Sequence, residues 1–536
     1  MLNQLKSFFS ERTNRNVFLY LLFLGGLFFS KAVLSISVGL FAIHWLADKD
    51  LKCKLYLLWK DKAIMVFLII YLLHLVGLLY TSDFAYAFKD IKTKIPLLVF
   101  PLIVVTEPQL SKTQFKTILH SFYVFALISS AVSMGVYLTK DTAVVRNITP
   151  FVSHIRFSLL TTLAACFMLY DYFMSQSKTS LLSLLKLVFG IALVVFTVVI
   201  IASFNGIVLL GAAFLFMIIL AIFKFRNIGY RLILLGVLIL LVSIPLLFTM
   251  NVHKKLFPPE VSLSIDTDAA TENGNKYEFR PELEVYESGM PVMMSFCDQE
   301  MEKEWNVRSS LPYDSVASNG FPVREVLMRY LTSASYTKDS AGVWLLSETD
   351  IREIEKGTPN ILLSGESPLE FRLYEFFNGY YNYKRTGNSN DNSLFLRFEF
   401  WKTALQIIAS NPFIGVGTGD VNIAFENQYE MMDSHLEQRW RVRSHNQFLS
   451  FGVAFGIPGM ILFIIALVFP FFARKKYNSF YFTTILIVLL LSMMTEDTIE
   501  TQVGASLFAF FYCFFLYYPE YCSTKNNHVS KKQPLE

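Results

Sequence analysis

Long apolar runs recur along most of the chain, and they limit its fold more than any other feature. A helix that crosses a membrane needs about 20 mostly apolar residues, and runs close to that length repeat. Of the 536 residues, 54% are hydrophobic and 17% are charged, whereas about a quarter of an ordinary soluble chain is charged. The sequence therefore predicts an all-α polytopic membrane protein and argues against a soluble multidomain enzyme.

About twelve of these runs are predicted to be transmembrane helices, each satisfying its backbone hydrogen bonds internally because lipid offers no partner. One large hydrophilic block separates the ninth helix from the tenth. The predicted helices lie near residues 16–30, 33–47, 63–80, 95–107, 116–137, 154–174, 183–202, 204–223, 231–249, 447–473, 479–494 and 502–519.

Basic residues in the short loops predict the orientation, because Lys and Arg are enriched on the cytoplasmic side. With the N-terminus in the cytoplasm, the cytoplasmic segments hold 21 basic residues and the opposite short loops hold six. Both termini are therefore predicted to be cytoplasmic. The predicted division is an N-terminal bundle at 1–249, a large outer loop domain at 250–446, C-terminal helices at 447–520 and a cytoplasmic tail at 521–536.

The hydrophilic block is acidic, with 29 Asp and Glu against 19 Lys and Arg in residues 250–445, although the chain has a net charge of +4. This balance gives no sign of a nucleic-acid partner. A structureless loop of this size is improbable, so the block should contain helices of its own. They are predicted at VREVLMRYL (323–331), at SETDIREIEKG (347–357) and, as an amphipathic helix ending at Asn411-Pro412, within 393–420. The stretch 258–320 receives no role.

His445 stands where the outer block returns to the membrane, beside Arg441 and Arg443. A histidine at such a place can act as a general base, or it can be an ordinary interfacial side chain. Arg156, just inside a predicted helix, and Arg397 can also each have one of two roles. Each can extend to the membrane surface, or each can bind phosphate, because a guanidinium matches phosphate oxygens in pairs.

Three other motifs indicate a function only weakly. The turn Gly415-x-Gly417-x-Gly419 follows a helix, so it lacks the context of a dinucleotide site; a flexible turn or a phosphate nest remains possible. Asp266-x-Asp268 can hold a metal in some enzymes, but it lies outside, away from sugar nucleotides. Glu496, Asp497 and Glu500 form either a solvated turn or a cluster that orients a histidine. The five cysteines form no CxxC pair, so no zinc site is predicted.

Two segments together resemble the O-antigen ligase and O-antigen polymerase superfamily, and the topology fits as well. The first is an Arg-x-x-x-Trp helix followed by Asn-Pro-x-x-Gly-x-Gly, and the second is His-Asn-x-x-Leu at the return to the membrane. A segment like 329–357 also resembles ligase-like members of the Bacteroidetes type. The matching residues are Arg397, Trp401, Asn411, Pro412, Gly415, Gly417, His445, Asn446 and Leu449.

The resemblance implies a glycosyltransferase of the bacterial inner membrane with a periplasmic loop. It would move a glycan from undecaprenyl pyrophosphate to lipid A–core oligosaccharide, with inversion and without metal or cofactor. His445 would be the base. The residues expected to bind pyrophosphate or substrate are Arg156, Arg397, Arg441 and Arg443, and those expected to support the site are Trp401, Asn446 and Glu496.

One departure from the family concerns a Ser-Arg-Gly-like motif near the middle of the chain. Here the stretch reads Ser203-Phe204-Asn205-Gly206, so a phosphate contact would come from elsewhere, from Arg156 or Lys94. Several rival functions remain. They are a polymerase that extends lipid-linked repeat units, a ligase that passes glycans to protein, a non-catalytic scaffold of an envelope complex, and a secondary transporter. A transporter usually has related halves and interrupted helices, and the sequence shows neither.

Overall fold

The computed structural model describes residues 11–48, 50–139, 148–175, 180–197, 204–224, 227–257, 270–283, 285–387, 389–390 and 394–518. A helix lies in each of the twelve predicted ranges. These helices are α2 (Arg12–Phe29), α3 (Lys31–Leu46), α5 (Lys62–Val76), α7 (Pro96–Thr106), α8 (Lys112–Thr139), α9 (His154–Met174), α10 (Leu181–Val195), α11 (Phe204–Lys224), α12 (Ile228–Leu256), α20 (Gln447–Ala473), α21 (Phe480–Thr495) and α22 (Gln502–Tyr517).

The prediction of a mostly helical membrane protein is confirmed, while the count of twelve spans stays a prediction. Within the described ranges, five helices are long and apolar enough to cross a membrane, or six if one bent pair forms a single span. That pair is α3 and the short α4 (Leu51–Lys60), which meet at 106°. Several other predicted spans, such as α7 and α10, are apolar helices of 11 and 15 residues.

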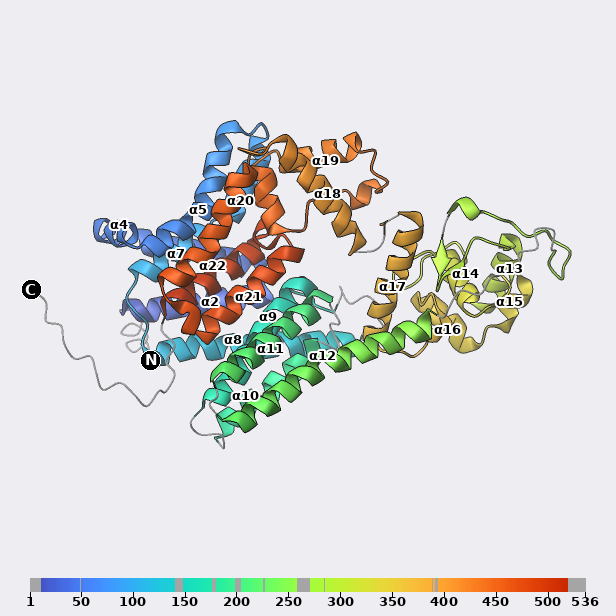
Figure 1. Ribbon diagram of the computed structural model, residues 1–536, viewed down its shortest axis with the longest axis horizontal. Coiled ribbons are helices and arrows are strands. Elements are labelled where there is room, and N and C mark those ends of the chain that lie inside the picture. The colour runs from blue at the N-terminus through green and yellow to red at the C-terminus, as the bar shows by residue number, and fades with distance from the viewer. Residues whose placement is uncertain are drawn as a thin grey trace, which may run out of the picture.

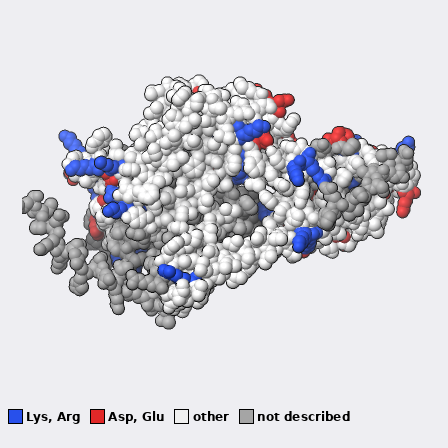
Figure 2. All heavy atoms as spheres, in the orientation of Figure 1, with Lys and Arg blue, Asp and Glu red and all other residues white. Residues whose placement is uncertain are grey.

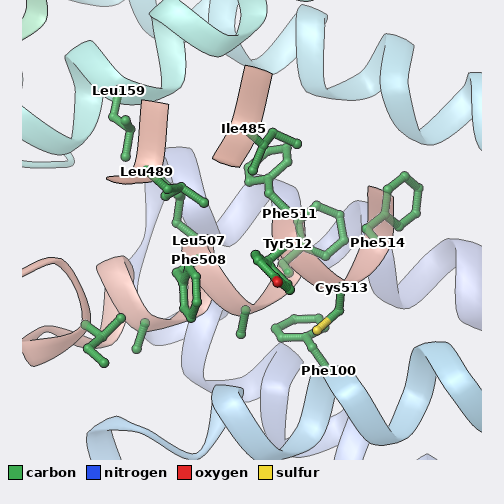
Figure 3. Packing of buried hydrophobic residues seen from close by; sticks show 14 of the residues in the cluster. Phe100, Leu159, Ile485, Leu489, Leu507, Phe508, Phe511, Tyr512, Cys513 and Phe514 are labelled. Carbon is green, nitrogen blue, oxygen red and sulfur yellow. The ribbon is translucent and has the colours of Figure 1, made fainter. Parts of the chain in front are cut away.

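The centre of the bundle is α22, whose residues from Val503 to Leu516 are all buried. A helix that is apolar on every side is stable only when it is surrounded, and α22 packs against α7, α21 and α2. Phe508, Phe511 and Phe514 belong to the same buried cluster as Phe100 of α7 and Ile485 of α21 (Figure 3). In contrast, the equally apolar α12 leaves the bundle as a long arm (Figure 1), with its most apolar window unburied.

The block after α12 begins with a separate small lobe, which we define as the described residues between 270 and 363. It has its own hydrophobic core, around side chains such as Trp305, Tyr313 and Tyr330. At the far end of the molecule from α4 (Figure 1), it holds η4 (Pro281–Leu283), the paired strands β1 (Tyr286–Glu287) and β2 (Met290–Pro291), α13 (Asp298–Arg308), α14 (Val323–Ser333), α15 (Ser340–Leu345), α16 (Glu348–Lys356) and η5 (Ile361–Leu363).

Two helix predictions in the small lobe are confirmed by α14 and α16. A capping box of Ser347 and Asp350 starts α16, and Gly357 ends it in the left-handed conformation, at φ 96°. A side chain at that φ would be strained, so the glycine is a true helix stop. The stretch 258–320 proves partly ordered, because it contains β1, β2 and α13. Asp266 and Asp268 lie outside the described residues.

The chain returns to the bundle through α17 (Pro368–Thr386), α18 (Phe395–Ser410), α19 (Val421–Met431) and η6 (Gln438–Trp440). The helix α18 is the predicted amphipathic one, and it ends at Asn411 as expected. Its buried residues, among them Phe400, Ala404 and Ile407, join the core of the bundle and not that of the small lobe. The last part of the outer block is therefore packed on the membrane helices.

Helix α20 is broken at Gly456, where φ is 70° and ψ is −175°. A normal helix would pair the Ile457 N–H with the Val453 carbonyl, but here it donates to Pro412 O at 2.8 Å. The carbonyls of Val453 and Ala454 instead accept from Val416 N and Gly417 N, each at 2.9 Å. The Asn-Pro-x-x-Gly-x-Gly segment thus completes the hydrogen bonds of a broken helix.

This arrangement corrects the view of the glycine-rich turn as a flexible turn or a phosphate nest. Thr418 N donates to Gly77 O, and Gly419 N donates to the Thr81 hydroxyl at 2.8 Å. The N–H groups of the turn are thus engaged by protein oxygens, and a Cβ on Gly419 would lie 2.1 Å from Asp83 O. The turn also precedes a helix, α19, as well as following one.

Candidate functional site

His445 directly precedes the N-cap residue of α20, and its backbone is held in the left-handed region at φ 45°. The next residue, Asn446, caps the helix: its side-chain oxygen accepts from Phe448 N and Leu449 N at 3.0 and 3.1 Å. The Asn446 amide also donates to Met494 O at 3.1 Å, which ties the start of α20 to the end of α21. The His-Asn-x-x-Leu motif therefore fixes the direction of the imidazole.

Glu496, directly after α21, lies between two cationic or basic side chains. Its Oε1 accepts from Arg397 Nη2 at 2.9 Å, and its Oε2 lies 3.6 Å from His445 Nδ1. Arg397 also donates from Nε to Thr495 O at 3.1 Å. The carboxylate is nearly covered, at 8% exposure, while the His445 side chain is 39% exposed. His445 thus reaches from a buried anchor toward open space.

Charge around Glu496 favours its ionised form. Burial is the largest influence and by itself raises the pKa of this carboxyl, but His445, Arg156 and Arg397 together hold the pKa below its usual value. The neighbouring Asp497 behaves in the opposite way, because burial and then the charge of Glu500 raise its pKa. Two adjacent carboxyls with pKa values moved in opposite directions are typical of functional sites.

Arg156, near the start of α9, lies inside the bundle and is 7% exposed. Its Nη2 donates to Asp497 O at 3.4 Å, and its buried Nε has no hydrogen-bond partner among the described residues. The Asp497 carboxylate is turned to Ser450, whose hydroxyl donates to it at 2.7 Å. A buried guanidinium with unused hydrogen-bonding capacity is costly, and the charges of Glu496 and Asp497 act on this one.

A second group of charges surrounds Glu500, in η8 (Thr498–Glu500). Its Oε2 accepts from Lys94 Nζ at 2.8 Å and from Arg443 Nη1 at 3.0 Å. Lys94 also donates to Asp90 at 2.5 Å, both residues being near or at the end of α6 (Phe84–Thr93). Arg443 further contacts the Tyr86 hydroxyl. Lys94, one of the two suggested phosphate contacts, is therefore already engaged with carboxylates.

The pKa values of the two carboxyls in this second group move in opposite directions. Burial raises the pKa of Asp90, whereas Lys94 and Arg443 overcome burial at Glu500 and hold its pKa well below the usual range. A narrow cavity runs between these side chains and the imidazole of His74 on α5. It has room for about one water molecule. It is therefore too small for a sugar.

Sequence reasoning missed Gln447, which ties the first turn of α20 to η8 in the second group. Its amide donates to Glu500 Oε1 at 3.0 Å and its carbonyl accepts from Ile499 N at 2.8 Å, and the residue is fully buried. Lys94 was considered, but His74, Tyr86 and Asp90 were also missed. Their only signal in the sequence is a polar residue within or next to an apolar helix, which does not show what it faces.

Two other predicted site residues lie beside this constellation. Arg441 donates from Nε to Leu436 O at 3.0 Å and from Nη2 to Ser434 O at 3.1 Å, so it braces its own loop. Trp401 packs against the bundle core, and its buried Nε1 has no hydrogen-bond partner within the described part of the chain. A role in substrate binding stays a prediction for both.

The residues of the site come from segments far apart in the sequence. Arg156, Arg397, His445 and Glu496 are brought together by α9, α18, α20 and the α21–α22 connection. They offer a half-exposed base, a buried carboxylate behind it and two guanidinium groups beside it. No cluster of metal-ligating side chains occurs among the described residues. The arrangement can remove a proton from a hydroxyl while it neutralises a departing anion.

The fold and the site define a multi-pass membrane protein with a buried ionic centre at one end of its helices. Residues 369–464 match the family model described as O-Antigen ligase. The match runs from α17 to the middle of α20 and includes Arg397 and His445. The resemblance drawn from the motifs is therefore confirmed for this segment, which is similar to the O-antigen ligase family. No curated protein matches the chain.

Proposed function

We propose that this protein is a glycosyltransferase of the O-antigen ligase type. It moves a glycan from undecaprenyl pyrophosphate to lipid A–core oligosaccharide on the periplasmic face of the bacterial inner membrane. The observation that carries the proposal is the line of Arg397, Glu496 and His445, with the free Nε of the Arg156 guanidinium beside Glu496. A base next to cations suits a reaction in which a hydroxyl attacks and a pyrophosphate leaves.

In the proposed step, Glu496 holds the Nδ1 side of the imidazole, which leaves Nε2 to accept the proton of an acceptor hydroxyl. The hydroxyl oxygen forms a bond to C1 of the first donor sugar as the bond from C1 to the pyrophosphate oxygen breaks. The electron pair leaves with undecaprenyl pyrophosphate, whose charge Arg156 and Arg397 stabilise. One displacement of this kind inverts the anomeric carbon and needs no metal.

The pairing of helix ends supports the predicted alternation of the helices, and the basic residues of the short loops favour the periplasm for the site. Predicted outer positions meet one another in the site, since His445, Glu496, Arg156 and Lys94 all stand at helix ends assigned to that side. Predicted inner positions meet as well, because Glu107 binds Arg12 and Lys54. An orientation that alternated differently would mix these two groups.

The test is a transfer assay with purified protein, a lipid-linked glycan donor and lipid A–core acceptor. Wild type should produce the ligated glycolipid, and His445→Ala should lower the rate by about 10²–10⁴-fold, the usual contribution of general-base catalysis. Lys52→Ala, an exposed substitution in α4, is the control and should retain the wild-type rate. Full activity of His445→Ala would remove His445 as the base.

The molecule that receives the glycan distinguishes a ligase from a polymerase or a protein glycan ligase. A product that grows on undecaprenyl pyrophosphate, without any transfer to lipid A–core, would identify a polymerase. Transfer to protein would identify a protein glycan ligase. No transfer by wild type to any of these acceptors would overturn the enzyme proposal in favour of a scaffold or a transporter.

A further inference from the structure

Three exposed apolar side chains gather on the small lobe, away from the ionic site. Trp344 is 56% exposed, and Leu345 beside it is 61% exposed, both on α15. Val307, on the packed neighbour α13, is 68% exposed. The lobe already buries a core of its own. A large aromatic residue left outside a completed core marks a surface that binds something.

The indole of Trp344 is held rigidly. Its Nε1 donates to Glu304 Oε2 at 2.9 Å, and the Arg308 guanidinium lies over the ring, 5.2 Å from its centroid. Arg308 is itself fixed, because it donates to Val343 O at 2.5 Å and to Leu346 O at 2.6 Å. One ring face and the N–H edge are therefore occupied by the protein. The exposed area is the remaining face, already ordered before any ligand arrives.

A flat apolar face with charged groups at its edge suits a saccharide. A pyranose ring presents C–H groups on one face, which can lie on an indole, and hydroxyls at its rim, which can reach a carboxylate at the edge of the indole. An anionic membrane surface suits it less, because α13 and α16 each carry more acidic than basic residues. The polar side chains over this lobe contrast with the nearly uncharged face of the bundle (Figure 2).

We propose that the free face of Trp344, with Glu304 at its edge, forms a saccharide-binding subsite on the small lobe, while Arg308 holds the indole from its other face. The subsite holds the glycan chain at a distance from the reacting sugar. This inference rests on the proposed function for the identity of its ligand, a long glycan, but binding does not require turnover. The subsite would let the protein retain a polysaccharide chain while its reducing end enters the ionic site.

The test measures binding of free polysaccharide to the full-length protein in detergent by titration calorimetry. The probe is the polysaccharide released by mild acid from the lipopolysaccharide of cells that carry this protein. Wild type should bind it saturably, and Trp344→Ala should weaken binding roughly tenfold, the upper effect of one aromatic contact. Trp344→Phe should recover part of the affinity. Trp59→Ala is the matched control, because Trp59 is 75% exposed on the distant α4.

Trp344→Leu separates stacking on an aromatic face from general apolar contact, because leucine keeps the apolar surface but loses the aromatic face. Affinity should fall in Trp344→Leu as it does in Trp344→Ala. No saturable binding by wild type, or equal binding by wild type and Trp344→Ala, would overturn the inference. So would normal binding by Trp344→Leu. Because calorimetry involves no transfer, these results are distinct from a failure of the transfer assay.

Discussion

The bundle contains two buried carboxylates that look alike in the sequence and differ in the structure. Glu107, at the end of α7, accepts from Arg12 Nε and Nη2 at 2.5 and 2.7 Å and from Lys54 at 2.8 Å. Glu496 accepts from Arg397 at 2.9 Å and faces His445 and Arg156. Both are shielded from solvent and both have several cationic or basic neighbours.

The difference lies in the hydrogen-bonding capacity left over. All three nitrogens of the Arg12 guanidinium reach a carboxylate oxygen, of Glu107 or of Asp48. Around Glu496, by contrast, the buried Nε of Arg156 has no hydrogen-bond partner in the described structure. The first cluster is a closed clamp that holds α2, α4 and α7 together. The second leaves one guanidinium donor unused, as the proposed binding of an anion requires.

The two clusters should differ most in stability and transfer rate when the carboxylate of each is removed. Glu107→Ala should lower the free energy of unfolding by about 3–5 kcal/mol, because it leaves Arg12 and Lys54 without their buried counter-charge. Glu496→Ala should cost less stability but reduce transfer by about a hundredfold, because the His445 imidazole loses its anchor. Thermal unfolding and transfer per folded molecule measure the two effects. Equal stability losses with unchanged turnover in both variants would contradict the distinction.

A change of cation should give a smaller contrast. Arg156→Lys keeps the charge but loses the planar fork, and the transfer rate should fall roughly tenfold, or about 1.4 kcal/mol. Arg12→Lys makes the same change in the closed clamp and should lower the melting temperature without changing the rate per folded molecule. An unchanged rate in Arg156→Lys would argue against pyrophosphate binding by this residue.

The dependence of stability on pH should give the smallest contrast. Because the folded chain lowers the pKa of Glu496, its ionised form favours folding above the unfolded-state value of about 4.3. That contribution is lost as the pH falls through the folded-state pKa. Below about pH 4.3, the melting temperature of wild type should therefore fall more steeply than that of Glu496→Gln, by a few degrees.

The exposed Glu302 supplies the control for this measurement. Glu302→Gln should follow the wild-type curve, because its side chain lies on the open face of α13. Parallel curves for wild type and Glu496→Gln would show that the site does not stabilise the Glu496 carboxylate.

The helices were predictable because hydropathy acts locally. Apolar runs such as the one in α22 can only be helical and buried or lipid-facing, and each predicted range holds a helix. The sequence did not distinguish the surrounded α22 from the exposed α12, since both are apolar on every side. Helix α17 was missed, although Ser367 and Glu370 form a capping box and Gly387 ends it. Those signals were present but lie in a polar region without clear periodicity.

The site was predictable only in part. His445 and Arg397 lie within motifs, and Arg156 drew notice because a cation inside an apolar helix is costly. These three side chains come together at Glu496 because distant segments pack against one another. Such packing leaves no local pattern in a single sequence. Gln447 and Asp90 were missed for the same reason. Arg441 has the same local signal as Arg443, but only the structure shows that it holds backbone carbonyls.

The break in α20 bears on how the position of His445 responds to the thickness of the bilayer. A long membrane helix tilts when the thickness of the surrounding lipid changes, and a continuous α20 would carry His445 along with it. Here the 412–417 segment binds both sides of the break, through the carbonyls of Val453 and Ala454 before it and the N–H of Ile457 after it. The position of the imidazole against its carboxylate is therefore fixed by this crossing segment, and does not depend on one continuous helix axis.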